Sequence, residues 1–346
     1  MSEAKFVLSK SKLNEQVNLL EKEGFSISYS YKTNQDAGDL LKNNRESLDF
    51  SVHSIRELEN LGASERAWFF TQANSQEEIE SLFSRGVKNF VIDNEIDLEN
   101  VLLAAKKYGK KANISIRMRF QEHRVGSGKY FVYGLPAKKA NDILKDLNKR
   151  EEVSELGIHL HRKSQNTSEW EIKEELEDSL EEEVLEILGN VNLGGGLPVK
   201  YRSHNLDVFQ YIISKLKVAK EFLESYGIDV YLEPGRFLAA PPIKLETEII
   251  QVQKNTLVLN TTIYKCALDT LITETKMLVE NELSENEEGQ NYLIKGNSPT
   301  RDDIFRYKVK LKNPKIGDKI VFLNAGAYNY TTDFFGYDKL KTEIVD

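Results

Sequence analysis

The sequence predicts an α/β fold in which a closed (β/α)8 barrel of the TIM type is followed by a smaller all-β domain. Between about residues 25 and 240, short runs of β-forming residues alternate with amphipathic, helix-like segments. These units number about eight, which is the count of a closed parallel barrel. From about residue 246 onward the chain is instead rich in Val, Ile, Thr and Tyr, with turn signals at Pro314 and Gly317.

The predicted strands follow one another at regular distances along the barrel region. The first, Ser26 to Lys32, alternates large apolar side chains with serines, and the others lie at 48–54, 66–72, 89–94, 113–119, 155–161, 191–194 and 229–233. Helix-like segments separate them, for example at 54–61, 75–84, 97–108, 137–148 and 206–226. A doubly wound open sheet is the alternative, but its first turn should carry the GxGxxG pattern, and this turn reads Lys-Thr-Asn-Gln.

Composition excludes several classes of protein. The 47 Lys and Arg residues and the 55 Asp and Glu residues give a net charge of −8, without any basic run, which argues against a nucleic-acid or anionic-membrane partner. One cysteine, Cys266, excludes intrachain disulfides and multi-cysteine metal sites. We find no apolar signal core and no long apolar run, and therefore expect a soluble, cytoplasmic protein.

The carboxyl ends of the predicted strands carry residue types suited to chemistry, and barrel enzymes place their active sites at that edge. Read in order, these ends are Lys32, His53, Gln72, Asn94, Arg117 or Arg119, His161, Gly194 to Gly196 and Glu233. A lysine at the end of a buried strand is unusual, because its ammonium loses hydration. Conversion to an imine with pyridoxal phosphate (PLP) removes that cost, whereas the simpler alternative is a lysine that reaches out to solvent.

The last two strands end in groups that suit a phosphorylated pyridine. The glycines after strand seven free backbone N–H groups for an anion, and Arg236 can add a bidentate contact; the alternative is a mobile loop. Glu233 facing a pyridine nitrogen would keep that nitrogen protonated. His161 could stack on the ring or orient a substrate carboxylate, but His159 points the same way along the strand, and the sequence leaves the choice between them open.

Four segments resemble motifs of the fold-type-III PLP-dependent decarboxylases, the group of ornithine, diaminopimelate, arginine and carboxynorspermidine decarboxylases. Tyr29-Ser-Tyr-Lys32-Thr-Asn34 resembles their lysine motif, and Gly157-Ile-His-Leu-His161-Arg-Lys-Ser164-Gln165 their His-x-Gly-Ser-Gln motif. Asn192 to Gly196 and Glu233 to Arg236 resemble their glycine triplet and pyridine-binding glutamate. The resemblance implies an alanine-racemase-type barrel at 11–243. It also implies a β-domain of 244–346 that takes the N-terminal strand from residues 1–10.

The resemblance also implies the roles of individual residues. Lys32 would be the Schiff-base lysine, Glu233 the partner of the ring nitrogen and His161 the stacking residue, and these three form the catalytic set. The remaining residues expected around the cofactor are Arg117 (with Arg119 as second choice), Ser164, Gly194, Gly195, Gly196, Gly235, Arg236 and Tyr328. No metal is expected.

The carboxyl-terminal domain departs from the family pattern. Gly296 to Asp303 resembles the segment that the family contributes across a dimer interface, which implies a homodimer with shared active sites. Pro299 stands where the family has a cysteine linked to reprotonation, Thr300 where a substrate-binding aspartate is common, and Ser51 at a position that is aspartate in many relatives.

The expected substrate-binding residues are Asp269, Thr300 and Asp303. The stretch from Asn260 to Leu271 resembles a carboxynorspermidine decarboxylase segment. We therefore expect Asp269 to bind the distal cationic group of the substrate. Cys266 lies near the site in this interpretation, or is simply a small buried apolar residue.

The resemblance implies decarboxylation of a basic L-amino acid (ornithine, arginine or lysine) to the corresponding amine, with a role in polyamine formation. Carboxynorspermidine and diaminopimelate are alternative substrates. Two further alternatives stay open: another PLP reaction on the same barrel, such as racemisation, and a non-catalytic regulatory homologue that forms mixed dimers.

Overall fold

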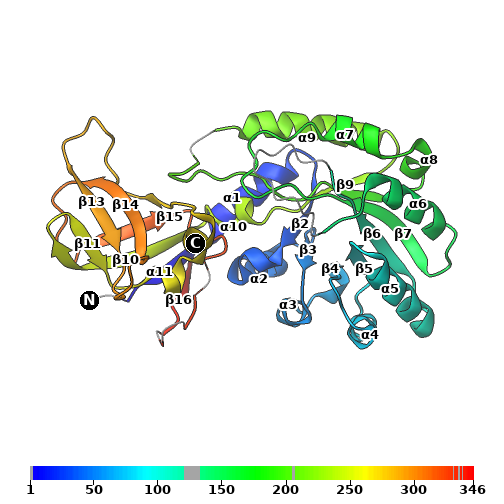
Figure 1. Cartoon of the computed structure of the whole chain (residues 1–346), viewed down its shortest axis with the longest axis horizontal. Helices are drawn as coiled ribbons and strands as arrows, with labels where there is room; N and C mark the ends of the chain where they lie inside the picture. The colour runs from blue at the N-terminus through cyan, green and yellow to red at the C-terminus, as the bar shows by residue number, and fades with distance from the viewer. Residues whose placement is uncertain (1–2, 121–132, 205–206, 330, 334–335, 337) are drawn as a thin grey trace.

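The computed structural model of the chain describes residues 3–120, 133–204, 207–329, 331–333, 336 and 338–346. In these residues a barrel and a β-domain lie side by side along the long axis of the molecule (Figure 1). Helices α1 (Lys10–Glu21) and α10 (Arg236–Ala239) lie where the two parts meet. The expected two-part fold is confirmed.

Eight parallel strands close the barrel in sequence order, from β2 to β9. They are β2 (Ser26–Ser30), β3 (Asp49–Val52), β4 (Ala67–Phe70), β5 (Asn89–Ile92), β6 (Ala112–Arg117), β7 (Val153–His159), β8 (Asn190–Asn192) and β9 (Asp229–Leu232). The ring closes where β2 pairs with β9. Their registers place Arg117 beside His159, and His159 beside Asn192, so the strand ends meet at one edge.

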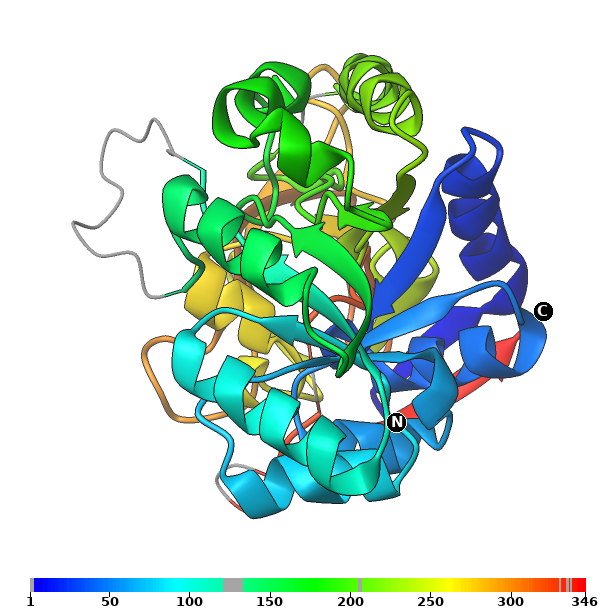
Figure 2. The same cartoon turned by 90° about the vertical axis from the view of Figure 1, so that its right-hand side faces the viewer.

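Helices follow the strands and surround the barrel, as the view in Figure 2 shows. They are α2 (Gln35–Asn44), α3 (Ile55–Leu61), α4 (Gln76–Ser84), α5 (Glu95–Tyr108), α6 (Ala137–Leu147), α7 (Ile172–Ser179), α8 (Glu182–Leu185) and α9 (Phe209–Glu224). Each of the helices α2 to α5 begins on an Asn or Ser cap that accepts from a backbone N–H three residues on, namely Asn34, Ser54, Ser75 and Asn94. These caps fix short loops between strand and helix at the edge where the site forms.

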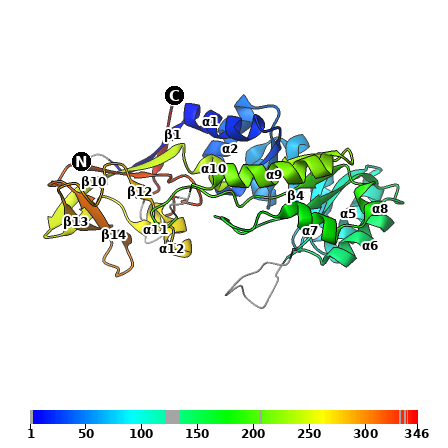
Figure 3. The same ribbon diagram turned by 90° about the horizontal axis from the view of Figure 1, so that it is seen from above.

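The β-domain is an eight-stranded sheet, seen on the left in Figure 1 and from above in Figure 3. Its strands from the C-terminal part are β10 (Ile243–Gln253), β11 (Thr256–Leu259), β12 (Leu278–Val279), β13 (Gln290–Lys295), β14 (Ile304–Leu311), β15 (Lys319–Leu323) and β16 (Lys341–Val345). The N-terminal strand β1 (Lys5–Ser9) pairs with β10 and β16. The N-terminal strand therefore joins the C-terminal domain, as expected. Two short helices, α11 (Ile263–Cys266) and α12 (Leu268–Thr273), connect β11 to the rest.

Two details differ from the sequence expectation or add to it. The first strand ends at Ser30, and Lys32 lies in a single 3-10 turn, η1 (Tyr31–Thr33), which leads into the Asn34 cap of α2. Among the described residues, no helix combines the length and apolar character that crossing a membrane requires.

Candidate active site

Most of the residues expected to bind the cofactor line one cavity at the carboxyl edge of the barrel. Nine of the eleven do so: Lys32, His161, Ser164, Gly195, Gly196, Glu233, Gly235, Arg236 and Tyr328. They come from η1, from the loops after β7, β8 and β9, from the start of α10 and from a loop of the β-domain. The barrel thus brings together residues that lie up to 296 positions apart in the sequence.

The side chain of Lys32 lines the cavity, and its amine lies against a neighbouring side chain. Its Nζ lies 3.1 Å from Nε2 of His53, the residue that follows β3. Burial lowers the pKa of the Lys32 amine, although the carboxylates of Glu233 and Glu57 oppose that shift. A lysine that reaches out to bulk solvent does not fit this placement.

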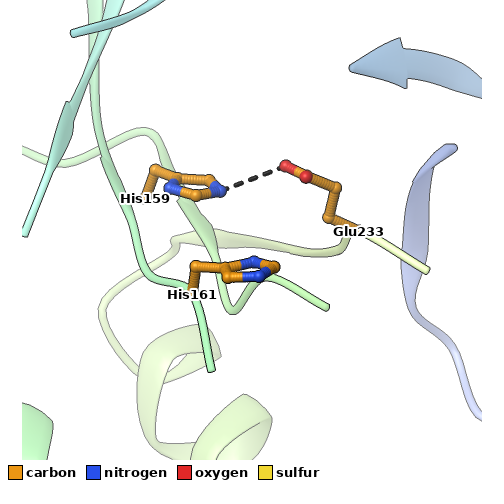
Figure 4. A group of neighbouring side chains, drawn as sticks. All are labelled: His159, His161 and Glu233. Atoms are coloured by element: carbon orange, nitrogen blue, oxygen red, sulfur yellow. Dashed lines mark hydrogen bonds and ion pairs between the residues drawn. The ribbon is translucent and has the colours of Figure 1, made fainter. Parts of the chain in front are cut away.

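Glu233 and two histidines form a compact group at the floor of the site (Figure 4). His159 Nε2 lies 3.1 Å from Glu233 Oε2, and both side chains are almost fully buried. The ring of His161 lies nearly parallel to that of His159, with an interplanar angle of 10° and a centroid separation of 6.4 Å. The two histidines share one face because they are two residues apart along β7 and its extension.

Burial and hydrogen bonding set the charges of this group. Burial lowers the pKa of His159 and brings the pKa of His161 to about 3, so both rings are neutral at pH 7. Burial is the largest effect on Glu233 and opposes its ionisation, but the hydrogen bond from His159 and the electrostatic effect of the neighbouring histidines together outweigh it, and the pKa of Glu233 falls to about 2. A neutral His159 that donates Nε2–H leaves its Nδ1 buried without a hydrogen-bond partner among the described residues. The site therefore presents an ionised carboxylate held by a neutral imidazole.

A glycine cradle, formed by Gly194–Gly196 and Gly235, lies beside this group. A Cβ at Gly194 would come within 2.1 Å of the Leu160 carbonyl oxygen, and one at Gly235 within 2.1 Å of Thr33 Oγ1. Gly194 and Gly196 also have positive φ angles, which favour glycine. The loops are tied together by the hydrogen bond from Asn166 N to Gly196 O. No acceptor among the described residues takes the N–H of Gly195 or Gly196, so both are available to an anion.

Arg236 is already engaged by the protein. Its guanidinium forms a bidentate pair with Asp269, at 2.6 and 2.7 Å, and both side chains are buried. It also donates to the hydroxyls of Tyr201 (3.1 Å) and Ser164 (3.2 Å). The expected bidentate contact between Arg236 and a phosphate is therefore not free in this structure, because Asp269 occupies the fork.

Tyr328, which lines the cavity, and Arg117, which does not, are both held by contacts with neighbouring side chains. Tyr328 accepts a hydrogen bond from Thr33 Oγ1 (3.3 Å), and its ring lies 5.2 Å from the Arg236 guanidinium. Arg117 stacks on Tyr133 at 4.0 Å and is close enough to Lys32, His161 and Glu233 to influence their ionisation. Arg119 instead lines a different cavity with Phe120 and Arg162, so the geometry favours Arg117.

The three expected substrate-binding residues have other partners in the single chain. Asp269 pairs with Arg236, as described above. Asp303 is fully buried and accepts from the backbone N–H groups of Ile263 (2.8 Å) and Ser298 (2.9 Å). Thr300 Oγ1 lies 2.9 Å from Ser298 Oγ. Neither carboxylate is thus free to bind a cationic substrate group in this arrangement, and Asp303 instead fixes the segment from Gly296 to Asp303.

The positions that depart from the family pattern are also defined. Pro299 is exposed in the single chain, while Ser51 is buried and bonds to Ser28 at 2.8 Å. Cys266 is fully buried; burial raises the pKa of its thiol to about 12, and its sulfur contacts Thr261 and Thr262. This favours the interpretation of Cys266 as a small apolar core residue.

Three residues near the site were not assigned a role from the sequence. The sequence predicts His53 only as the end of a strand, and no sequence motif assigns a role to Tyr201 or Glu57. Glu57 follows His53 by four residues, and Ser54 between them is the cap of α3. A spacing of four residues at the start of a helix, directly after a strand, is the sequence pattern that could have predicted the contact between His53 and Glu57.

The residues present fit PLP. A lysine with a lowered pKa, an ionised carboxylate and a glycine cradle with free N–H groups lie around one cavity. The potential ligand atoms of His159, His161 and Glu233 also lie within 4.8 Å of one another. The hydrogen bond between His159 and Glu233 already uses two of these groups, and we assign no metal to them.

Comparison with curated proteins gives relatives of known activity. The carboxynorspermidine/carboxyspermidine decarboxylase of Campylobacter jejuni is 29% identical over 244 residues, which are 62% of this chain and 57% of that protein. Its counterpart in Herminiimonas arsenicoxydans is 27% identical over 50% of this chain and 46% of that protein. The diaminopimelate decarboxylase of Zymomonas mobilis is 24% identical over 88% of this chain and 76% of that protein. The matches to the first two relatives thus span only about half of their lengths.

Solved structures show the same fold. The diaminopimelate decarboxylase of Helicobacter pylori in complex with L-lysine has a TM-score of 0.83 at 18% identity, covering 100% of this chain and 92% of that one. The lysine/ornithine decarboxylase of Vibrio vulnificus in complex with cadaverine has a TM-score of 0.80 at 18% identity, covering 99% and 94%.

The family itself follows from a match over the barrel. The family model described as "Pyridoxal-dependent decarboxylase, pyridoxal binding domain" matches residues 10–240, which is well over half of the 346 residues. Every element that carries the cavity, except the loop of Tyr328, lies within this range. The chain therefore belongs to the pyridoxal-dependent decarboxylases.

Proposed function

We propose that this protein is a PLP-dependent decarboxylase that converts a basic amino acid to the corresponding amine. The single observation that carries the proposal is that Lys32, Glu233 and three glycines of the cradle, Gly195, Gly196 and Gly235, line one cavity. A cofactor that reacts with an amine, pairs with a carboxylate at its ring and carries a phosphate needs these three groups together.

The chain's own groups would divide the work. Lys32 would hold the cofactor through its amine. Glu233, ionised and oriented by His159, would face the pyridine nitrogen and keep it protonated. His161 would support the ring, and the N–H groups of Gly195 and Gly196 would hold the phosphate. When bound, the cofactor supplies the electron sink for breaking the bond between Cα and the substrate carboxylate.

Asp269 supports this arrangement in a different way from the one expected from the sequence. Its pairing with Arg236 favours a role in holding the guanidinium near Ser164 and Tyr201 at the phosphate end of the site. A substrate-binding role for Asp269, Thr300 or Asp303 stays a prediction, which the contacts in the single chain do not support.

The substrate class is drawn from relatives. The structural neighbours include a lysine/ornithine decarboxylase and an arginine decarboxylase. Ornithine, lysine and arginine all carry a positively charged side chain, so we take a basic amino acid as the substrate. The second candidate is carboxynorspermidine or carboxyspermidine, which the similarity to the C. jejuni protein favours, and diaminopimelate is the third. A role in polyamine formation, a cytoplasmic location and a homodimer with shared sites complete the proposal.

The test is to incubate the purified protein with PLP and a panel of ornithine, lysine, arginine, carboxynorspermidine and diaminopimelate. Products are identified by mass, and CO₂ release is followed. We expect one amine to form with equimolar CO₂. The variant Lys32→Ala, which lacks the reacting amine, should lose at least about 10³-fold in rate and the visible absorption of lysine-bound PLP.

The matched control is Lys42→Ala, a lysine on α2 whose amine bonds to the Leu61 carbonyl oxygen, away from the cavity. It should keep both rate and absorption. Conversion of an L-amino acid to its D-isomer without CO₂ release would point instead to racemisation. A protein that binds PLP through Lys32 but turns over no member of the panel would support the regulatory alternative.

A further inference from the structure

His53 holds a position that the proposed roles do not explain. Its Nε2 lies 3.1 Å from Lys32 Nζ, which is within hydrogen-bond distance of the reacting amine. Among the described residues, no other side-chain group is recorded within hydrogen-bond distance of that amine. His53 is therefore the side chain placed to exchange a proton with the Lys32 amine.

Glu57 faces the other side of the imidazole. Its Oε2 lies 3.6 Å from His53 Nδ1 and accepts the backbone N–H of His53 at 2.7 Å. Burial is the largest effect on Glu57 and would raise its pKa, but the backbone hydrogen bond from His53 and the nearby His53 and Lys32 side chains together outweigh it, so the pKa is lowered and Glu57 is ionised. A carboxylate on this side favours the tautomer with the proton on Nδ1, and leaves the lone pair of Nε2 for Lys32.

Packing fixes the plane of the ring. The imidazole of His53 stacks on Phe70, the last residue of β4, at a centroid separation of 4.6 Å and an angle of 19°. Phe70 in turn meets the edge of His159 at 4.9 Å. The His53 side chain remains 25% exposed, although its Nδ1 is buried and has no hydrogen-bond partner among the described residues.

The other charged groups around Lys32 are less suited to take its proton. Glu233 is bonded to His159, Arg117 is a cation that stacks on Tyr133, and His161 has a pKa lowered to about 3 by burial. Burial also lowers the pKa of Lys32 itself, which eases loss of its proton.

We propose that His53 is a catalytic base and acid for Lys32 and that Glu57 is its positioning residue. The inference rests on the proposed function, since it assigns the proton of the lysine that reacts with the cofactor. The Lys32 ammonium gives one proton to His53 Nε2 and becomes the neutral amine, which can condense with an aldehyde carbon while the aldehyde oxygen leaves as water. The imidazolium that forms keeps its Nδ1–H toward the Glu57 carboxylate, and it returns a proton from Nε2 to the Lys32 amine when the lysine is released.

The experiment measures the reaction of Lys32 itself. Cofactor-free protein is mixed with PLP, quenched with borohydride at increasing times, and the reduced adduct on Lys32 is quantified by peptide mass spectrometry over a range of pH. General acid and base groups contribute about 10²- to 10⁴-fold, so His53→Ala should slow the labelling of Lys32 by at least about 10²-fold. Added imidazole should restore at least about tenfold of that loss, since it can enter the space of the missing ring.

Two variants complete the set. Glu57→Gln should give a smaller fall and a shifted pH profile, because the imidazole stays but loses its carboxylate. His204→Ala is the matched control: His204 lies in a loop, where its Nδ1 is 3.1 Å from Ser203 Oγ, and its removal should leave the labelling unchanged. If His53→Ala does not fold by circular dichroism, His53→Gln, which keeps a side chain of similar length, takes its place.

The results separate two kinds of failure. Labelling of Lys32 in His53→Ala at the wild-type rate would overturn the role of His53, and so would a loss that imidazole does not restore. Absence of labelling at Lys32 in the wild-type protein would overturn the proposed function instead.

Discussion

At the scale of single residues, burial at the barrel mouth keeps His161 neutral, whereas hydrogen bonding keeps Glu233 charged. The pKa of His161 falls from 6.5 to about 3, because burial penalises the imidazolium. The pKa of Glu233 falls from 4.5 to about 2, because the hydrogen bond from His159 and the electrostatic effect of the neighbouring histidines together outweigh burial, which is the largest single effect. In both cases the folded chain binds the proton less readily than the unfolded chain does.

Acid should therefore destabilise the cofactor-free protein. Below about pH 6.5 the unfolded chain takes up a proton at His161 that the folded chain refuses, and below about pH 4.5 the same holds for Glu233. Each group contributes its full share of the folding stability above its own pH value, and this share is lost as the pH decreases below that value. Because His161 retains some exposure, we expect a loss from it of about 1–2 kcal/mol between pH 6.5 and 5.

Urea unfolding at a series of pH values checks this prediction. His161→Asn, which cannot titrate, should lose less stability over that interval than the wild type, while His204→Asn should follow the wild type. Equal slopes for the wild type and His161→Asn would show that His161 is not held neutral by the fold.

At the scale of elements, one buried ion pair joins the two domains. Arg236 lies at the start of α10, at the end of the barrel, and Asp269 lies in α12 of the β-domain. Asn329, which follows Tyr328, accepts the Asp269 backbone N–H at 3.1 Å. The pair thus connects the phosphate end of the cavity with two segments of the β-domain.

Asp269→Asn should destabilise the protein by about 3–5 kcal/mol, since it leaves a buried guanidinium without its counter-charge. The free energy of unfolding in urea measures the loss. The matched control, Glu177→Gln, breaks an exposed pair with Lys173 and should cost no more than about 0.5 kcal/mol. A loss in Asp269→Asn as small as in the control would mean that the pair does not stabilise the joined domains.

At the scale of the whole molecule, none of the three residues expected to bind substrate is free to do so in the described part of the single chain. Asp269 and Asp303 are both engaged, and the exposed Pro299 and partly exposed Thr300 lie on the segment expected to cross to a partner. Apolar side chains of α12, Leu271 and Ile272, are also exposed. These features agree with the proposed homodimer, in which the β-domain of one chain completes the cavity of another.

Mixing two inactive variants tests this arrangement. Lys32→Ala removes the lysine from one barrel, and Thr300→Arg blocks the site to which the segment belongs. If the segment acts across the interface, random mixed dimers contain one intact site, and the mixture should recover about a quarter of the wild-type rate. Light scattering should report a dimer. A mixture without recovered activity, or an active monomer, would contradict shared sites.

The motifs identified from the sequence were those in which local pattern and chemistry coincide. Lys32, the glycine triplet and Glu233 each begin within two residues after the end of a short strand, and the period of the strands and helices placed those ends at one edge of a barrel. The fold class followed for the same reason, since periodicity is a property of neighbouring residues. The exact end of β2 could not be predicted from this periodicity, because the 3-10 turn at Lys32 leads into the helix cap at Asn34.

The sequence by itself determined the barrel, the additional β-domain and the lysine, glutamate and glycines of the site. Only the tertiary structure decided that Asp269 pairs with Arg236, that Asp303 holds backbone N–H groups, and that His53 lies against Lys32. The physical reason is that a carboxylate or imidazole takes whichever partner the packed fold brings within about 3 Å. Arg236 and Asp269 meet from two different domains, and no spacing along the chain encodes such a meeting.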